Sequence, residues 1–344
     1  MGIEQILSAI LVFGILILFH ELGHFITAKW TGMGVSEFAI GFGPKLLWKR
    51  KGETEYSIRL IPLGGYNKID GMDPEEEQTE RSFSGKPVWA RALVIASGSF
   101  MNFVLPIILF TIIFTFSGAE KASDKPMIGA LVPNKPAAIS GLQAGDKIMS
   151  INDIPTITWN EVVQTIRTSN TKPLILRIER EGTQSEISVV PEFDSKYERQ
   201  VIGIIPIITK EKFGIADSIN AAFQQTIGIA KIMLIGIVNM IFGNAEPDLA
   251  GPIGVIQMAA QQSKLGIYPL LQFTAFLSIN LGLINLLPIP LLDGGHIITL
   301  LVEAVRGKPL SKTQARFTQM VGLAFLLMIL LLTTFKDIVR LNIF

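Results

Sequence analysis

Residues 6–19 read ILSAILVFGILILF, and residues 20–25, which follow directly, read HELGHF. The first stretch contains no charged side chain and is typical of a membrane-spanning helix. Two histidines and a glutamate then occur where such a helix would reach the edge of a lipid bilayer. Because titratable groups are costly at that depth, the motif indicates a functional site.

The spacing of the HELGH residues predicts a metal site. His20 and His24 are four residues apart, so on a helix they share one face and can bind one ion. Glu21 lies one residue round from them, where a general base acting on a metal-activated water would be placed. The chain has no cysteine, so its metal ligands would be nitrogen and oxygen atoms, which suit Zn²⁺. A histidine pair that only decorates the membrane interface is the alternative.

A third ligand must come from elsewhere in the chain. Residues 278–297, SINLGLINLLPIPLLDGGHI, form the other polar cluster at the end of an apolar segment. Asp293 and His296 are both candidates, and spacing alone does not choose between them. Pro288 and Pro290 would end the helix, and irregular backbone at membrane depth is tolerated only around a protein-lined cavity.

The composition indicates a membrane protein with several helices. The 344 residues are 49% hydrophobic and 17% charged, and the mean hydropathy is +0.45. A net charge of +1 gives no reason to expect a nucleic-acid partner. We expect about four transmembrane helices, beginning near residues 6, 92, 270 and 321. A fifth apolar run, residues 231–242, is too short for a full span and is expected at the membrane interface.

The chain therefore reads as a polytopic α-helical membrane protein with an inserted α+β domain of short strands. The expected segments are a first transmembrane helix with HELGH (1–30), a cytoplasmic-side β region (31–91), a second transmembrane helix (92–118), a soluble extracytoplasmic domain (119–206), interfacial helices (207–264), a third transmembrane helix with LLDGG (265–304), and a cytoplasmic loop with a fourth transmembrane helix (305–344).

Basic residues set the expected orientation. They are concentrated in the connections 29–91 and 306–316, which the positive-inside rule assigns to the cytoplasm, with both chain ends outside. HELGH and LLDGG then lie at similar depth near the cytoplasmic side. A full crossing by residues 231–242 would place the two motifs at opposite faces, which favours the interfacial interpretation of that run.

With these motifs in view, the chain resembles the site-2 protease family of intramembrane zinc metalloproteases, most closely the bacterial regulator of sigma-E protease branch. The resemblance covers nearly the whole length and is carried by HELGH and by the motifs GFGPKL (41–46), PLGGY (62–66), AGPIGV (250–255) and LLDGGH (291–296). It implies that the zinc ligands are His20, His24 and Asp293, with Glu21 as the catalytic residue. The resemblance thus selects Asp293 over His296.

The resemblance also implies how a substrate is held. Asn280 and Asn285 would bind an unwound substrate together with Gly64 and Gly65, and residues 45–63 would form a membrane-reentrant β-hairpin whose edge pairs with the substrate backbone.

The soluble domain resembles a single PDZ module. Two positions depart from the family pattern, which often has Gly-Pro before the asparagine of SGSFMNF (97–103) and more commonly Val than Asn67. We expect neither departure to touch the metal site.

The expected function is hydrolysis of peptide bonds within the transmembrane segments of single-span proteins, such as anti-sigma factors or signal-peptide remnants, in the bacterial plasma membrane. One alternative is a catalytically silent, membrane-tethered PDZ scaffold, against which the complete HELGH motif argues. Another is a metal transporter, but transporters tend to show paired broken helices in repeated halves, and this sequence shows no repeat.

Overall fold

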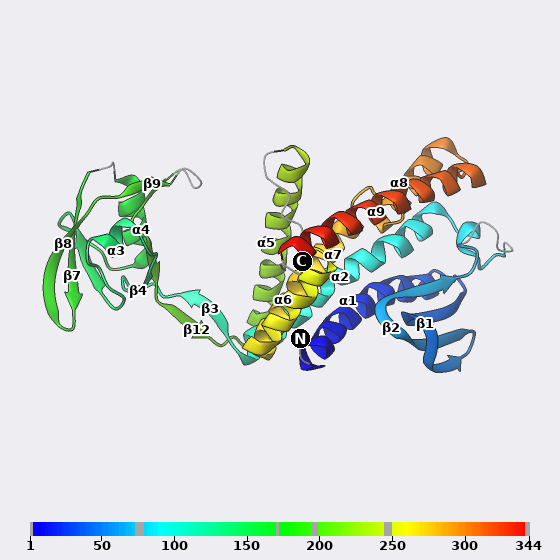
Figure 1. Ribbon diagram of the computed structural model, residues 1–344, viewed down its shortest axis with the longest axis horizontal. Helices are drawn as coiled ribbons and strands as arrows, with labels where there is room; N and C mark the ends of the chain where they lie inside the picture. The colour runs from blue at the N-terminus through cyan, green and yellow to red at the C-terminus, as the bar shows by residue number, and fades with distance from the viewer. Residues whose placement is uncertain (1–2, 73–78, 170–171, 195–198, 244–249, 341–344) are drawn as a thin grey trace. The chain divides into compact units, whose positions relative to one another are not determined.

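Long apolar helices make up most of the first of two compact units. The computed structural model describes residues 3–72, 79–169, 172–194, 199–243 and 250–340. The first unit comprises residues 1–116 and 214–344, and the second comprises residues 117–213 (Figure 1). The helices of the first unit are α1 (Ile3–Trp30), α2 (Val88–Phe116), α5 (Ile215–Ile241), α6 (Pro252–Leu265), α7 (Ile267–Asn285), α8 (Asp293–Arg306) and α9 (Lys312–Arg340).

Helices α1, α2 and α7 pack together in alternating directions. His24 of α1 contacts Val94 of α2, whereas His20 contacts Asn102, so these two helices are antiparallel. Ser278 of α7 donates a hydrogen bond to the main-chain oxygen of Asn102. The shared core is apolar and contains Val12, Leu16, Leu105, Leu109, Phe110, Ile113, Ala222, Leu270, Ala275, Leu277 and Ile279.

Five helices in the described part of the chain are long and apolar enough to cross a membrane, where the sequence suggested about four. The additional helix is α5, which is continuous over Ile215–Ile241. The expectation of a short helix over 231–242 is therefore wrong in length. Polar residues in the first half of α5 hid the helix from a hydropathy reading, but this half still packs against α2.

The inference that a crossing by residues 231–242 would separate HELGH from LLDGG does not hold. Helix α6 follows α5, packs against both α1 and α7, and is joined to α7 by Gly266 alone. Gly266 has a φ of +120°, a backbone conformation that glycine adopts readily. The chain therefore reverses at Gly266, and α7 runs parallel to α1 whatever depth α5 reaches.

The AGPIGV motif begins α6 and is held by α9. The carboxylate of Asp337 on α9 is buried and accepts hydrogen bonds from the main-chain N–H groups of Gly251 and Gly254. A carboxylate at a helix N-terminus satisfies N–H groups that the helix itself leaves unpaired. A Cβ at Gly251 would lie 2.5 Å from the Asp337 Oδ2 atom, so this contact requires glycine.

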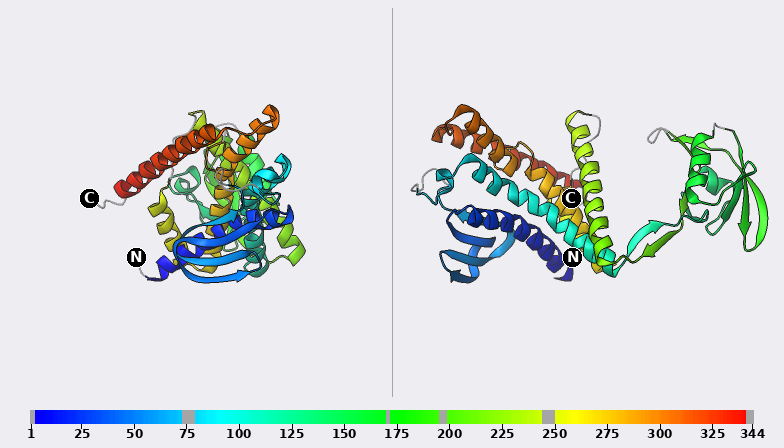
Figure 2. Two further views of the ribbon diagram at one scale, coloured as in Figure 1. Left: turned by 90° about the vertical axis from the view of Figure 1, so that its right-hand side faces the viewer. Right: turned by 180° about the vertical axis from the view of Figure 1, so that it is seen from behind.

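Strands β1 (Val35–Lys51) and β2 (Thr54–Ile69) form one antiparallel sheet that packs against α1 (Figure 2). Residues 37–40 pair with 65–68 on one side and with 55–58 on the other. Residues 45–51 pair with 54–59, so residues 55–58 have partners on both sides. In this sheet, segments 45–51 and 65–68 each have partners on one side and form its two edges. Of the expected hairpin 45–63, residues 45–51 therefore lie at an edge, whereas residues 55–58 do not.

The second unit contains the expected soluble domain. Its main sheet has the order β6-β5-β7-β8 and is antiparallel throughout. Helix α4 (Trp159–Thr168) begins with a capping box between Thr158 and Glu161. The strands are β3 (Ala119–Ala122), β4 (Ile128–Leu131), β5 (Lys147–Ile151), β6 (Ile154–Pro155), β7 (Leu174–Arg180), β8 (Thr183–Val189), β9 (Glu192–Asp194), β10 (Arg199–Val201), β11 (Ile204–Pro206) and β12 (Ile208–Glu211), with a short helix α3 (Pro136–Ile139).

A buried carboxylate just before β5 forms an ion pair with a residue of β7 in the second unit. Asp146 has no exposed side-chain surface and binds Arg180, with Oδ1 2.7 Å from the Arg180 Nε atom. Burial alone would raise the pKa of Asp146, but hydrogen bonds from Arg180 and from the main-chain N–H of Gln143 outweigh it and lower the pKa.

Candidate metal centre

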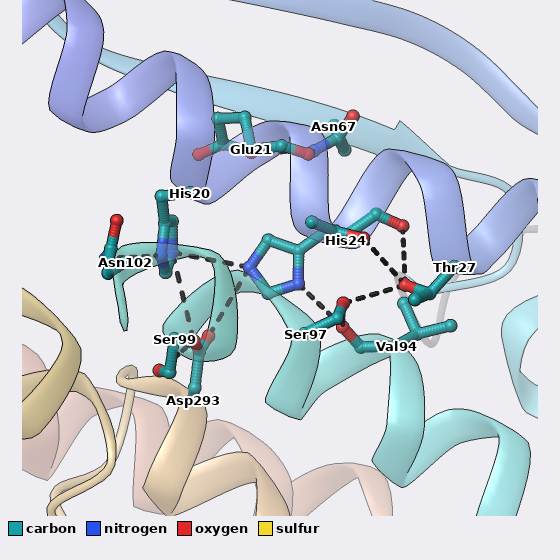
Figure 3. Close-up of polar contacts among 11 residues, drawn as sticks. His20, Glu21, His24, Thr27, Asn67, Val94, Ser97, Ser99, Asn102 and Asp293 are labelled. Atoms are coloured by element: carbon teal, nitrogen blue, oxygen red, sulfur yellow. Dashed lines mark hydrogen bonds and ion pairs between the residues drawn. The ribbon is translucent and has the colours of Figure 1, made fainter. Parts of the chain in front are cut away.

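Three side chains from α1 and α8 converge on one point (Figure 3). The Nε2 atoms of His20 and His24, one helical turn apart, lie 3.3 Å from each other. Asp293, the first residue of α8, places Oδ1 3.6 Å from the His24 Nε2 atom and Oδ2 3.8 Å from the His20 Nε2 atom. One candidate ligand atom from each side chain lies within 4.8 Å of the others. His296 does not belong to this group, although spacing alone had left it as a candidate.

The hydrogen bonds around the cluster suit a bound cation. The Nδ1–H of His24 donates to the main-chain oxygen of Val94 over 2.8 Å, so its Nε2 atom faces the cluster with a lone pair. The Ser99 hydroxyl donates to the Asp293 Oδ2 atom over 2.8 Å and orients that carboxylate. Acceptors that face one another need a cation or a proton between them. Two imidazole nitrogens and a carboxylate oxygen are a ligand set that zinc binds.

The side chain of Asn102 also fits a metal bound by His20. Its Nδ2 atom lies 3.2 Å from the His20 Nδ1 atom, and its Oδ1 atom is buried without a hydrogen-bond partner in the described part of the chain. If His20 offers Nε2 to a metal, its Nδ1 atom carries the proton. A half-turn of the Asn102 amide would then let Oδ1 accept that proton. The residues present therefore fit a metal held by His20 Nε2.

Glu21 lies on another side of α1, against strand β2 (Figure 3). Its Oε2 atom and its main-chain oxygen each accept a hydrogen bond of 2.7 Å from the Asn67 Nδ2 atom. The expectation that the two departures from the family pattern leave the metal site untouched is therefore wrong. Asn67 binds Glu21, and Ser99, in the SGSFMNF segment, binds Asp293.

Comparison with known proteins assigns the chain to a family. Residues 8–329 match Peptidase family M50. The chain belongs to this family and is a peptidase. It is 32% identical, over an alignment 422 positions long, to the regulator of sigma-W protease RasP of Bacillus subtilis, covering 99% of this chain and 100% of the relative. It is 33% identical, over an alignment 419 positions long, to the zinc metalloprotease RasP of Bacillus licheniformis, covering 98% of this chain and 99% of the relative.

A solved PDZ domain of the SdrC-like protein from Listeria innocua is also similar to part of this chain. The similarity covers 26% of this chain and 100% of that domain, at 20% identity and a TM-score of 0.23.

Glycines let the backbone of this M50 peptidase approach the cluster. A Cβ at Gly98 of α2 would lie 2.2 Å from the His24 Nε2 atom. A Cβ at Gly294 would lie 2.2 Å from the Leu287 oxygen, and one at Gly295 would lie 2.3 Å from the Ile289 oxygen. The two glycines of LLDGG thus allow the loop after α7 to fold over the start of α8, and this packing fixes the position of Asp293.

The loop that carries Asp293 also contains a strained residue. Leu291 has a φ of +76°, a conformation that is unfavourable for a side chain branched beyond Cβ. Such strain persists only where the surroundings hold the backbone, and it is concentrated at functional sites. The strained backbone at Leu291 therefore indicates that the surrounding structure holds the loop, and with it Asp293, in a fixed position.

The remaining predicted residues lie on α7 and β2. Asn280 and Asn285 are half-buried near the end of α7, and their side chains make no hydrogen bond to a residue that the structure describes. Gly65 faces α1, where a Cβ would lie 3.0 Å from the Glu21 Cγ atom. Gly64 has a φ of +138° and faces Phe42, whose ring a Cβ would approach to 1.9 Å. Both glycines are thus required by close packing next to the site.

Sequence reasoning missed the hydrogen-bonding residues of α2. Ser99 and Asn102 are fully buried and contact Asp293 and His20. These two residues could have been found as polar residues inside an otherwise apolar span. Such residues are rare in membranes and face the protein interior.

Proposed function

We propose that His20, His24 and Asp293 hold a zinc ion and that Glu21 is the general base of an intramembrane endopeptidase. The observation that carries the proposal is the convergence of the three ligand atoms within 4.8 Å. Helix α1, which supplies the histidines, and helix α7, which leads to Asp293, are both long and apolar enough to cross a membrane. Membership in a peptidase family, together with relatives named zinc metalloproteases, supports an enzyme over a scaffold or a transporter.

The residues of the site divide the chemistry between them. His20, His24 and Asp293 would hold the zinc, which would supply Lewis acidity toward a peptide carbonyl and a water. Glu21 takes a proton from the attacking water and passes it to the leaving amine. Val94, Ser99 and Asn102 hold the ligand side chains in place, because hydrogen bonds from outside the ligand set fix its geometry.

The substrate that suits this site is an extended membrane segment. A peptide bond inside a helix is shielded by the hydrogen bonds of that helix, so the substrate must unwind before cleavage. Residues 65–68 offer a strand edge beside Glu21, and pairing there requires backbone groups and little side-chain specificity. The amides of Asn280 and Asn285, which bond to no residue that the structure describes, would help to hold the unwound segment. Single-span proteins of the bacterial plasma membrane are the proposed substrates.

Replacing Glu21 tests the proposal. Glu21→Gln preserves the shape of the side chain but removes the base, so cleavage of a synthetic single-span peptide in detergent should fall at least about a hundredfold. Zinc content, measured by atomic absorption, should not change. Glu4→Gln is the matched control, since it makes the same change at an exposed position of the same helix and should leave cleavage intact. Normal turnover by zinc-loaded Glu21→Gln would exclude Glu21 as the base.

A further inference from the structure

Asn67 connects the edge strand of the sheet to Glu21. It lies in the segment 65–68, where it pairs with Phe38. Its Nδ2 atom donates to two acceptors, the Oε2 atom and the main-chain oxygen of Glu21, each over 2.7 Å. An amide nitrogen carries two hydrogens, so both donors of Asn67 are used on Glu21 alone.

The chemistry of the two acceptors fixes the orientation of this amide. A main-chain oxygen only accepts hydrogen bonds, and so does an ionised carboxylate. A half-turn of the Asn67 amide would place Oδ1 against both oxygens and would lose both bonds. Asn67 therefore presents its nitrogen to Glu21.

The other end of the same amide argues against a purely structural role. The Asn67 Oδ1 atom is buried and has no hydrogen-bond partner among the described residues. A buried unpaired carbonyl oxygen is unfavourable, and an apolar side chain of similar shape would avoid that cost. Packing alone would favour such a residue, so the hydrogen bonds to Glu21 are the feature that explains an asparagine here.

The contact leaves the two carboxylate oxygens of Glu21 in different environments. Oε2 is held by Asn67, whereas Oε1 makes no hydrogen bond to any residue that the structure describes. A base that keeps one oxygen fixed has a restricted rotamer, and its other oxygen is available to a water.

We propose that Asn67 is a positioning residue that holds Glu21 in its working orientation and leaves Oε1 to receive the proton. The proposal rests on the assignment of Glu21 as the base. Because Asn67 lies on the strand edge proposed to pair with substrate, it also links that edge to the base. Its loss should slow the chemical step more than it weakens substrate binding.

The test compares three variants of the full-length protein on a synthetic single-span peptide in detergent. Asn67→Leu keeps the approximate shape but removes both donors, and we expect kcat to fall about tenfold or more, with KM changed less than about twofold. Asn67→Asp should lose at least as much, because it places a second carboxylate against Glu21. Zinc content and the melting temperature of Asn67→Leu should stay at wild-type values.

Ser57→Ala is the matched control within the same sheet. Ser57 is buried and donates to the Glu37 Oε1 atom over 2.9 Å, so this variant removes a hydrogen bond of the sheet without touching Glu21. It should keep wild-type kcat.

Three results would overturn the proposal: Asn67→Leu with wild-type or higher kcat, an equal loss in Ser57→Ala, or a loss that follows zinc content. If Glu21→Gln were active, the proposed function would fail, whereas an inactive Glu21→Gln beside a fully active Asn67→Leu would contradict this inference alone.

Discussion

Single residues of the site differ in how far the sequence predicts them. The sequence predicts that His20 and His24 act as a pair, because a helix places residues four apart on one face. Asp293 and His296 remained equivalent by spacing, and the family resemblance chose between them. Asn67 and Ser99 were missed because their contacts join positions 46 and 194 residues apart in the chain. No local periodicity predicts which distant side chains will meet.

The choice of Asp293 can be tested by metal analysis. Asp293→Ala should lose zinc, because it removes the only carboxylate of the described ligand group. His296→Ala should retain zinc, since His296 lies outside that group although it is on the same helix. Zinc per protein, measured after dialysis against a weak chelator, distinguishes the two variants. Loss in His296→Ala with retention in Asp293→Ala would mean that the third ligand is wrongly assigned.

At the scale of elements, helices were easier to predict than the pairing of strands. The apolar runs marked the starts of α1, α2 and α7 within a few residues, because hydropathy reports burial in lipid directly. Helix α9 begins at Lys312 rather than near residue 321, and the segment 265–304, expected as one transmembrane helix, contains the two helices α7 and α8. Helix α5 was underestimated, since polar residues of its first half, such as Ser218 and Thr226, lower the apparent hydropathy although they are buried. The double pairing of residues 37–40 could not be predicted, because strand register depends on which face is buried.

An ion pair joins α8 to α2. Both terminal nitrogens of Arg91 on α2 bind Glu303 on α8, with Nη1–Oε2 and Nη2–Oε1 distances of 3.0 and 2.6 Å. The two side chains are only 10% and 15% exposed. Helix α8 begins at Asp293, so this bidentate contact helps to orient the proposed third ligand.

Replacing only one residue of the Arg91–Glu303 pair should lower the stability of the protein. Glu303→Gln leaves Arg91 as an unpaired, nearly buried charge, which typically costs about 3 kcal/mol. We expect a lower melting temperature in detergent and weaker zinc retention. The double variant Arg91→Met with Glu303→Leu should recover most of the stability, because it removes both charges. Glu211→Gln, which breaks an exposed pair with Lys121, is the control and should change little. Equal effects of Glu303→Gln and Glu211→Gln would show that the Arg91 pair does not hold α8.

At the scale of the whole molecule, the inserted domain was predictable and its independence from the site is testable. The change from apolar runs to short alternating strands marked residues 119–206, and the second unit, 117–213, contains them. Every residue of the candidate centre belongs to the first unit, whose two parts of sequence lie on either side of this insertion.

Removing the second unit should leave a competent metal centre. Ala119 and Glu211 are paired neighbours at the base of the insertion, so deleting residues 120–210 and joining these two by a short Gly-Ser turn spans a gap of about 5 Å. The deletion variant should retain zinc and should cleave a short synthetic single-span peptide, since its ligands and base are unchanged. We also expect it to cleave single-span proteins that carry a bulky folded domain, which the intact protein should reject if the second unit excludes substrates by size. The same deletion with Asp293→Ala is the inactive control. A folded, zinc-loaded deletion variant that fails on the short peptide would show that the second unit supports catalysis directly.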